Sequence, residues 1–212
     1  MIKIERIKNE AKKHFKESKG SHGWDHTLRV YKLCLHIGEI EGADMEILET
    51  AALLHDIGRA REDESKGKIC HAKTGAKMAS DLLLSLGIDK EKTAKVIHCI
   101  ETHRYRNDIM PESLEAKVLF DADKLDSIGA VGIGRAFLFA GEVGAKLHNN
   151  GVDIEQTKAY TEEDTAYREY MVKLRKIKGR MMTGEGKRIA AGRHEYMAGF
   201  FDRMDKEVEG LL

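Results

Sequence analysis

Apolar residues recur along this chain at steps of three and four, with little of the strict alternation that is typical of a half-buried strand. The sequence contains one proline, Pro111, so few positions oppose a helical backbone. We therefore expect an all-α protein. The pattern predicts helices over about 2–17, 26–41, 45–57, 72–86, 90–104, 112–128, 130–147, 162–178 and 185–209.

Two segments between the predicted helices are polar and longer than simple helix connections. They are residues 58–71, "GRAREDESKGKICH", and residues 148–160, "HNNGVDIEQTKAY". Either segment could border a substrate site. With 212 residues, 42% of them hydrophobic, the chain can bury one sizeable core, and we expect a single globular domain over residues 1–212.

The charge balance favours a small-molecule partner. Lys plus Arg and Asp plus Glu both number 36, so the formal net charge at pH 7 is zero. Because the chain has no long basic block, we expect neither a nucleic-acid partner nor an anionic membrane surface. The oligomeric state is left open by the sequence.

Cysteine usage and hydropathy indicate the compartment. Cys34, Cys70 and Cys99 are an odd number without CxxC spacing, which argues against a disulfide framework and against a zinc–thiolate site. No segment approaches the roughly 18 apolar residues of a membrane span, and the N-terminal stretch lacks the apolar core of an export signal. The expected location is therefore the reducing cytoplasm.

Three predicted helices end their apolar stripes in side chains that are costly to bury. In the helix predicted over 26–41, His26 lies one turn before the apolar stripe. In the helix predicted over 45–57, the apolar stripe continues through "AALLHDIGRA" into His55 and Asp56. In the third helix the same spacing leads to Asp123 and then Asp126. Because such groups cost several kcal/mol when buried unpaired, the pattern indicates a divalent cation. This mixture of imidazoles and carboxylates suits Mn, Fe, Co, Ni or Zn and suits Ca poorly.

Three stretches carry a resemblance to a known family. "SHGWDHTLRV", "ALLHDIGR" and "LFDADKLDSIGAVGIGR" resemble the first histidine, the His-Asp doublet and the distal aspartate of the HD-domain superfamily of metal-dependent phosphohydrolases. The resemblance implies an all-helical domain with a core over about 20–140 and C-terminal helices over about 160–209 packing on it. It also implies one divalent ion (Mn, Fe, Co, Ni, Zn or Mg), held by His26, His55, Asp56 and Asp123.

Three aspartates in "DADKLD" compete for the role of distal ligand. Asp123 matches the family's aspartate, because it follows a small residue and precedes a basic residue and a leucine. Asp126 lies one helical turn further on the same face, where it could act in catalysis by orienting a water or the substrate, or could simply pair with a nearby base. Asp121 points about 200° away round the helix from Asp123 and is expected to be structural or to support a ligand.

A phosphorylated substrate also needs fixed cations near the metal. Arg29, one turn beyond His26, is the first candidate, although an ion pair at the surface is an equal alternative. Lys124 and Arg135 are the next. His71 and His103 lie on apolar stripes, and we expect them to contact the substrate, although in some HD relatives two further histidines hold a second metal.

The overall layout looks most like small bacterial stand-alone HD hydrolases, some of which are nucleoside triphosphate pyrophosphohydrolases. That resemblance implies hydrolysis of a small phosphorylated substrate, a triphosphate giving a monophosphate and pyrophosphate. The alternatives are an HD-type nucleotide phosphomonoesterase or phosphodiesterase. From other functional classes, a non-catalytic nucleotide-binding sensor and a di-iron oxygenase also stay open.

Overall fold

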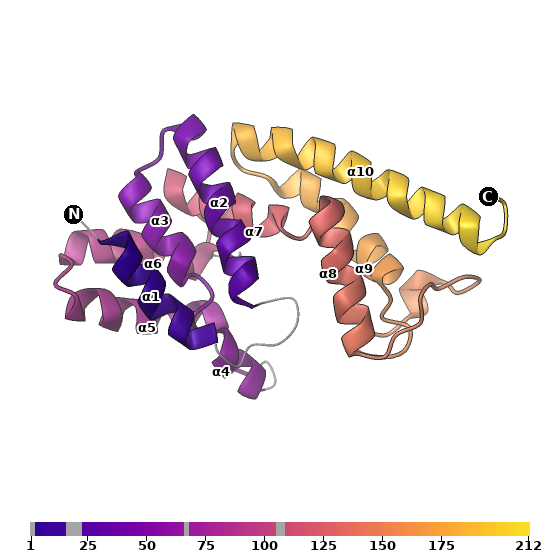
Figure 1. Cartoon of the computed structure of the whole chain (residues 1–212), viewed down its shortest axis with the longest axis horizontal. Helices are drawn as coiled ribbons and strands as arrows, with labels where there is room; N and C mark the ends of the chain where they lie inside the picture. The colour runs from indigo at the N-terminus through magenta and orange to yellow at the C-terminus, as the bar shows by residue number, and fades with distance from the viewer. Residues whose placement is uncertain (1–2, 16–22, 66–67, 105–108) are drawn as a thin grey trace. The chain divides into compact units, whose positions relative to one another are not determined.

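The computed structural model describes residues 3–15, 23–65, 68–104 and 109–212, and within these ranges every regular element is a helix (Figure 1). The all-α prediction is therefore confirmed. The chain divides into two compact units, Met1–Asp123 and Lys124–Leu212. The expectation of a single domain stays a prediction, and the two units are described separately.

The first unit holds the elements that carry the predicted metal ligands. Its helices are α1 (Ile4–Lys12), η1 (Lys13–Phe15), α2 (Trp24–Glu41), α3 (Met45–Leu54), α4 (Arg59–Glu64), α5 (His71–Ser85) and α6 (Lys90–Thr102), and α7 (Leu114–Leu125) begins in it.

Local capping signals explain where several of these helices begin and end. Gly42 adopts a left-handed backbone with φ 77° and ends α2, a conformation that glycine adopts without strain. The Asp44 carboxylate accepts hydrogen bonds from the backbone N–H groups of Glu46 (3.1 Å) and Ile47 (3.3 Å) and so starts α3. Asp89 starts α6 in the same way, by accepting from Lys92 N at 2.9 Å.

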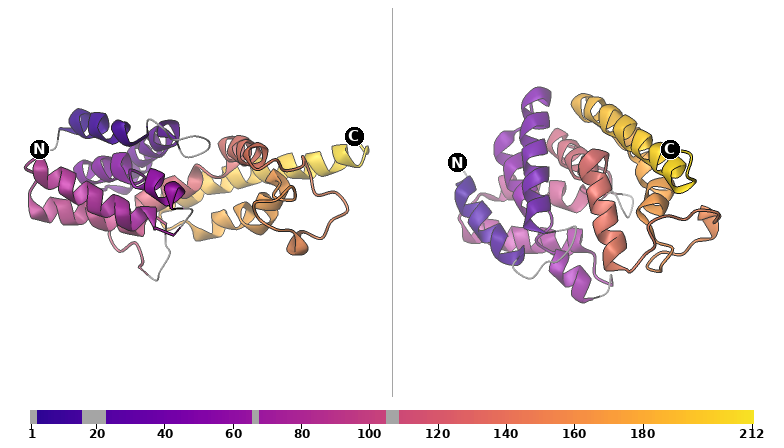
Figure 2. Two further views of the ribbon diagram at one scale, coloured as in Figure 1. Left: turned by 90° about the horizontal axis from the view of Figure 1, so that it is seen from below. Right: turned by 45° about the vertical axis from the view of Figure 1, so that its right-hand side comes forward.

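Helix α3 lies at the centre of the first unit. It packs against α1, α2 and α6, and α5 lies alongside α6 (Figure 2). Seven of its ten residues are buried, so it is apolar almost all round. Because the chain leaves α3 at Leu54 inside this core, the next residues, His55 and Asp56, are also buried.

Helix α4 was not expected, because it lies in the predicted linker over 58–71. Its sequence "RAREDE" has no apolar stripe, and all six of its residues keep at least partial exposure. Ion pairs between residues one turn apart stabilise it instead, such as Arg59 with Glu62 at 3.2 Å. Residues 66–67 of the same linker lie outside the described residues.

The second unit is built on two long helices. Its elements are α8 (Gly129–Glu142), η3 (Ile154–Gln156), α9 (Ala166–Val172), η4 (Leu174–Arg180) and α10 (Gly184–Val208). Helix α8 packs against α9 and α10. Arg193 of α10 donates through NH1 to the Leu125 carbonyl at 2.6 Å and so satisfies an end of α7.

The helix predicted over 162–178 is shorter than expected and starts later. The Thr165 hydroxyl accepts from Arg168 N at 3.0 Å and caps α9, whereas the Thr161 hydroxyl is engaged with the Lys158 carbonyl at 2.8 Å. The Arg168 guanidinium also donates through Nε to the Thr157 hydroxyl at 2.7 Å. These polar contacts order the long linker before α9.

In the part of the chain that the structure describes, no helix combines the length and the apolar character needed to cross a membrane.

The three cysteines are free, and their environments predict different reactivity. Cys34 and Cys99 are fully buried, and burial raises the pKa of the Cys34 thiol well above its ordinary value and that of Cys99 to about 12. Cys70 is half-buried. We expect one rapidly reacting thiol in a titration of the native protein with Ellman's reagent, and all three after denaturation, because the thiolate is the reactive form. A second rapid thiol, or the same rapid phase in Cys70→Ser, would contradict this.

Candidate metal centre

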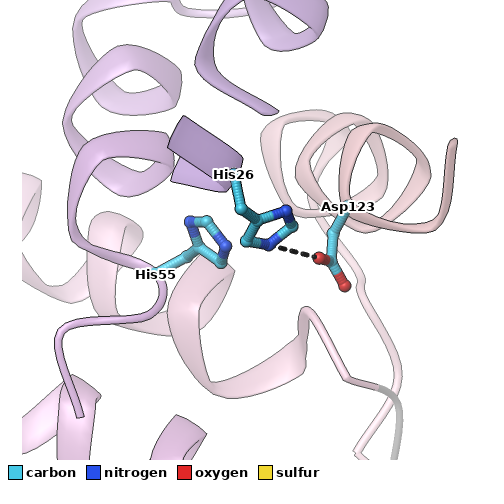
Figure 3. A group of neighbouring side chains, drawn as sticks. All are labelled: His26, His55 and Asp123. Atoms are coloured by element: carbon cyan, nitrogen blue, oxygen red, sulfur yellow. Dashed lines mark ion pairs between the residues drawn. The ribbon is translucent and has the colours of Figure 1, made fainter. Parts of the chain in front are cut away.

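His26, His55 and Asp123 meet inside the first unit although they are far apart in the sequence. One ligand atom from each lies within 4.8 Å of the others, and Figure 3 shows the three side chains pointing toward one another. His26 Nε2 lies 3.4 Å from Asp123 Oδ1. Both histidines are buried, whereas Asp123 keeps partial exposure.

Each of these side chains is placed by the end of a helix. His26 is the third residue of α2, and Asp123 lies in the last turn of α7. His55 follows α3 directly, and the chain then turns back, with Arg59 N donating to the Asp56 carbonyl at 2.9 Å. The predicted apolar stripes therefore do end at a common point, as the sequence indicated.

The His55 ring is oriented as a metal ligand would be. Its Nδ1 donates to the Ala52 carbonyl at 2.8 Å, so its Nε2 carries a lone pair. Among the described residues this buried Nε2 has no hydrogen-bond partner. An unsatisfied buried acceptor facing a second imidazole and a carboxylate is costly unless a cation lies between them, and the residues present therefore fit a metal ion.

Asp56 lies between two groups of histidines. Its Oδ2 is 3.7 Å from His26 Nε2 and 3.8 Å from His55 Nε2, whereas its Oδ1 is 3.1 Å from His71 Nε2 and 3.7 Å from His103 Nε2. The Asp56 side chain is only 4% exposed. One buried carboxylate thus offers one oxygen to each group.

The second group, formed by Asp56, His71 and His103, is more deeply enclosed than the first. All three residues are buried, and the two Nε2 atoms lie 3.2 Å apart. His103 Nδ1 donates to the Ile100 carbonyl at 2.6 Å, and His71 Nδ1 is hydrogen-bonded to Glu62. Two imidazole nitrogens and Asp56 Oδ1 converge here, a donor set of the kind that binds a divalent cation.

Burial and charge hold the ligands in the forms that bind metal. Burial lowers the pKa of His55 to about 4, with further lowering from His103 and His26. Burial alone would raise the pKa of Asp56, but the neighbouring His55 and hydrogen bonds from His103 and His71 hold it well below its ordinary value. At neutral pH His55 is neutral and Asp56 is anionic, as metal ligation requires.

Arg29, Arg135 and Asp126, three of the other predicted residues, each form an ion pair. Arg29 NH1 donates to Asp25 Oδ2 at 2.6 Å, one turn back along α2. In the second unit Arg135 NH1 donates to the Asp126 carboxylate at 2.7 Å and to the Asp126 carbonyl at 3.2 Å. Lys124 is half-buried in the last turn of α7. The expected contacts of Arg29, Lys124, Asp126 and Arg135 with a substrate stay predictions.

Sequence reasoning missed three charged residues at the second group. The Glu62 carboxylate accepts from His71 Nδ1, from Arg59 NH1 at 3.2 Å and from Arg104 NH1 at 2.7 Å. The signals available were weak: Arg59 and Glu62 stand one turn apart in a segment read as a linker, and Arg104 directly follows His103. Neither signal distinguishes a buried network from a solvated face.

Comparison with known proteins identifies the class of fold and site. The family model described as "HD domain" matches residues 23–128, a range that contains all six histidines and aspartates of the two groups. The chain belongs to the HD domain family and is an enzyme of the HD hydrolase superfamily. HD domains are metal-dependent, in agreement with the donor groups described above.

Several relatives are similar over nearly the whole chain. YpgQ of Bacillus subtilis, an uncharacterized protein, is 36% identical over 199 residues, which cover 92% of this chain and 88% of that protein. The crystal structure of YpgQ in complex with ADP superimposes with a TM-score of 0.77 at 32% identity, covering 99% of this chain and 100% of that one. The crystal structure of an HD-superfamily hydrolase from Bacillus thuringiensis also superimposes with a TM-score of 0.77. It is 30% identical and covers 98% of this chain and 97% of that one.

A more local match is to ribonuclease Y of Chloroflexus aurantiacus. It is 34% identical over 111 residues, which are 52% of this chain but only 19% of that protein. The likeness is therefore confined to a small part of the ribonuclease.

The turn after Asp56 depends on Gly58. A Cβ atom on Gly58 would lie 2.5 Å from the His71 carbonyl oxygen and 2.6 Å from Gly75 N, and backbone atoms cannot rotate away. We expect Gly58→Ala to lower the free energy of unfolding by about 1–3 kcal/mol in urea titrations, because it overpacks the contact between the start of α4 and α5.

The matched control is Gly134→Ala in α8, where an added Cβ meets nothing within 4 Å. That change is expected to leave stability unaltered or to raise it by up to about 1 kcal/mol, because alanine is the better helix former. Equal effects of the two substitutions would contradict the close approach at Gly58.

Proposed function

We propose that this protein hydrolyses a nucleoside triphosphate to a nucleoside monophosphate and pyrophosphate. The observation that carries the nucleotide part is that YpgQ, which is similar over 99% of this chain, was crystallised with ADP. Membership of the HD hydrolase superfamily supports the hydrolytic part.

One divalent metal ion, held by His26, His55, Asp56 and Asp123, is the cofactor we propose. When bound, such an ion lowers the pKa of a water molecule and polarises a phosphoryl oxygen. The chain contributes the orientation of the ligands: the Ala52 carbonyl holds the His55 ring with Nε2 inward, and the two carboxylates balance the charge of the ion. Mn, Fe, Co, Ni, Zn and Mg all remain candidates for the metal.

The phosphate contacts we propose come from arginines and one lysine. Arg29, Lys124 and Arg135 are the cations predicted from the sequence. The two guanidinium groups offer planar donors that match phosphate oxygens, and the ammonium of Lys124 acts as a point charge. We assign Asp126 the catalytic role of orienting the attacking water or the substrate. Its ion pair with Arg135, at 2.7 Å, fixes the orientation of the carboxylate.

His71 and His103 have two candidate roles. The sequence favoured contact with the substrate. The approach of their Nε2 atoms to each other at 3.2 Å and to the same oxygen of Asp56 supports a second bound cation instead. Metal stoichiometry in the purified protein decides between them: one ion per chain favours substrate contact, and two favour a dinuclear site. Two iron ions with oxygen consumption would move the protein into the di-iron oxygenase class.

Phosphodiester hydrolysis is the second candidate function. It is favoured by the match to ribonuclease Y, although this chain aligns to only 19% of that protein. A short single-stranded RNA offered under the same conditions distinguishes the two. Cleavage of RNA at a rate above that of triphosphates would replace the proposal, while the metal-dependent hydrolase class would stand.

The proposed reaction is tested by hydrolysis of nucleoside triphosphates in water labelled with heavy oxygen, with each candidate metal supplied in turn. Attack at the α-phosphorus places the label in the monophosphate and releases pyrophosphate, both read by mass spectrometry. Label in orthophosphate, or consumption of monophosphates alone, would remove the pyrophosphohydrolase assignment.

Removing a proposed ligand should empty the metal site. We expect His55→Ala and Asp56→Ala to lose bound metal in elemental analysis while keeping helical circular dichroism, because each removes a donor and leaves like groups facing one another. His36→Ala, an exposed histidine of the same helix as His26, is the control and should keep wild-type metal content. Full occupancy in either ligand variant would contradict the assignment.

A further inference from the structure

Two arginines meet at one carboxylate beside the second histidine group. Glu62 of α4 accepts from Arg59 NH1 at 3.2 Å and from Arg104 NH1 at 2.7 Å. Arg59 is the first residue of α4, whereas Arg104 follows the end of α6. The Glu62 side chain is 12% exposed, and those of Arg59 and Arg104 are 19% and 17% exposed. Two cationic side chains from different helices are therefore held, mostly buried, at one edge of the site.

The charges of this cluster do not balance. Two guanidinium groups face the single carboxylate of Glu62, which leaves one positive charge in excess within the cluster. Asp63 Oδ1 lies 3.7 Å from Arg59 Nε, but the Asp63 side chain is 65% exposed, so water screens most of this attraction. A mostly buried cation without a matching anion is costly, because the protein replaces little of the water that the cation has lost. The excess charge therefore favours an anionic ligand.

Each arginine keeps donors that an anion can use. Within the described residues, every hydrogen bond of either guanidinium group is made by NH1, and the buried Nε of Arg59 has no hydrogen-bond partner. The NH2 groups of Arg59 and Arg104 remain as planar donors of the kind that matches the oxygens of a phosphate group. Because Glu62 holds both arginines by NH1, the two side chains are ordered before a ligand arrives, and less entropy is lost on binding.

The cluster adjoins the proposed metal ligands. Arg59 NH1 and Arg104 NH1 each lie 3.1 Å from His71 Nδ1. On the other side of the same ring, His71 Nε2 lies 3.1 Å from Asp56 Oδ1. One imidazole ring thus separates the guanidinium groups from a carboxylate that we assign to metal. A chain of linked phosphates that passes this ring would have one phosphate near the ligands and another against the arginines.

We propose that Arg59 and Arg104, ordered by Glu62, form a clamp for one phosphate group of the substrate. Sequence analysis identified neither arginine as a substrate contact. The arrangement of the clamp follows from contacts within the first unit, whereas the identity of the substrate rests on the proposed function. The phosphate bound here either leaves with pyrophosphate or stays on the nucleoside, and the choice of probe separates these two sources.

Equilibrium binding tests the clamp without turnover. Calorimetry is carried out on the protein with the metal that it carries when purified, using inorganic pyrophosphate and, separately, adenosine monophosphate. We expect Arg59→Gln and Arg104→Gln to weaken the binding of at least one probe about 10- to 100-fold, the usual effect of losing a hydrogen bond between charged groups. Weaker binding of pyrophosphate assigns the clamp to the leaving phosphates, and weaker binding of the monophosphate assigns it to the phosphate that stays on the nucleoside.

Arg61→Gln is the matched control, because it makes the same change at an exposed arginine of α4. Its affinity for both probes should stay within about twofold of the wild type, since an exposed charge is screened by water. Arg104→Lys keeps the positive charge without the planar fork, and its loss of affinity should be smaller than that of Arg104→Gln. If the glutamine variants lose their helical circular dichroism, Arg104→Lys decides, and wild-type affinity in it overturns the proposal.

Two further results would overturn the clamp. One is wild-type affinity for both probes in folded Arg59→Gln and Arg104→Gln, or a loss in Arg61→Gln equal to theirs. The other is the failure of the wild type to bind either probe.

Kinetics then relate the clamp to turnover. We expect Arg59→Gln and Arg104→Gln to raise KM for the triphosphate about 10-fold or more, because they remove contacts made in the bound substrate. A lower kcat with unchanged KM and unchanged affinity for the probes would assign the arginines a merely structural role between α4 and α6 and refute the clamp. If the wild type hydrolyses no triphosphate, the proposed function fails, whereas calorimetry still decides whether phosphate binds here.

Discussion

The interior position of one carboxylate, Asp56, is the constraint on which the rest of the site depends. A buried anion is tolerated only when surrounding groups compensate for the water it has lost. Here four imidazole rings from different helices surround it, two near each oxygen, and hydrogen bonds from His71 and His103 hold the pKa of the Asp56 carboxyl well below its ordinary value. The helices of the first unit therefore have to converge on the end of α3. The apolar surroundings of α3 provide the energy for that convergence, because burial of its whole surface draws α1, α2 and α6 around it.

The orientation of the histidines follows from the backbone around them. Two of the rings are held by carbonyl groups three residues earlier in the chain, at Ala52 for His55 and at Ile100 for His103. In both cases the histidine follows directly after a helix, where carbonyl groups are left without a partner inside the helix. Helix ends thus supply the hydrogen bonds that turn each Nε2 inward. His71 stands at the start of α5, where no such carbonyl is available, and its Nδ1 is hydrogen-bonded to the Glu62 carboxylate instead.

Much of this arrangement could be predicted from the sequence. The three- and four-residue spacing indicated an all-α fold, and the polar ends of the apolar stripes pointed to His26, His55, Asp56, Asp123 and Asp126. The choice of Asp123 over Asp126 as a ligand rested on the resemblance to the HD-domain superfamily, because the two share one helix face. Helix α4 and its Glu62 could not be found in this way, because an ion-paired helix without a buried stripe has the same pattern as a solvated linker. The pair of Asp126 with Arg135 crosses the turn between α7 and α8, so the i, i+4 spacing of a single helix gives no signal for it.

The close approach of Gly58 to α5 has a consequence for how fast the site can change shape. Side chains exchange rotamers within picoseconds to nanoseconds, but two packed main-chain segments separate only through slower, collective motion. The span between Asp56 and His71 is set by such a main-chain contact, since no side chain intervenes between Gly58 and Gly75. The main chain that carries Asp56 and His71 therefore loses little conformational entropy when a ligand binds between these side chains. The rigid backbone contact thereby raises the binding affinity of the site.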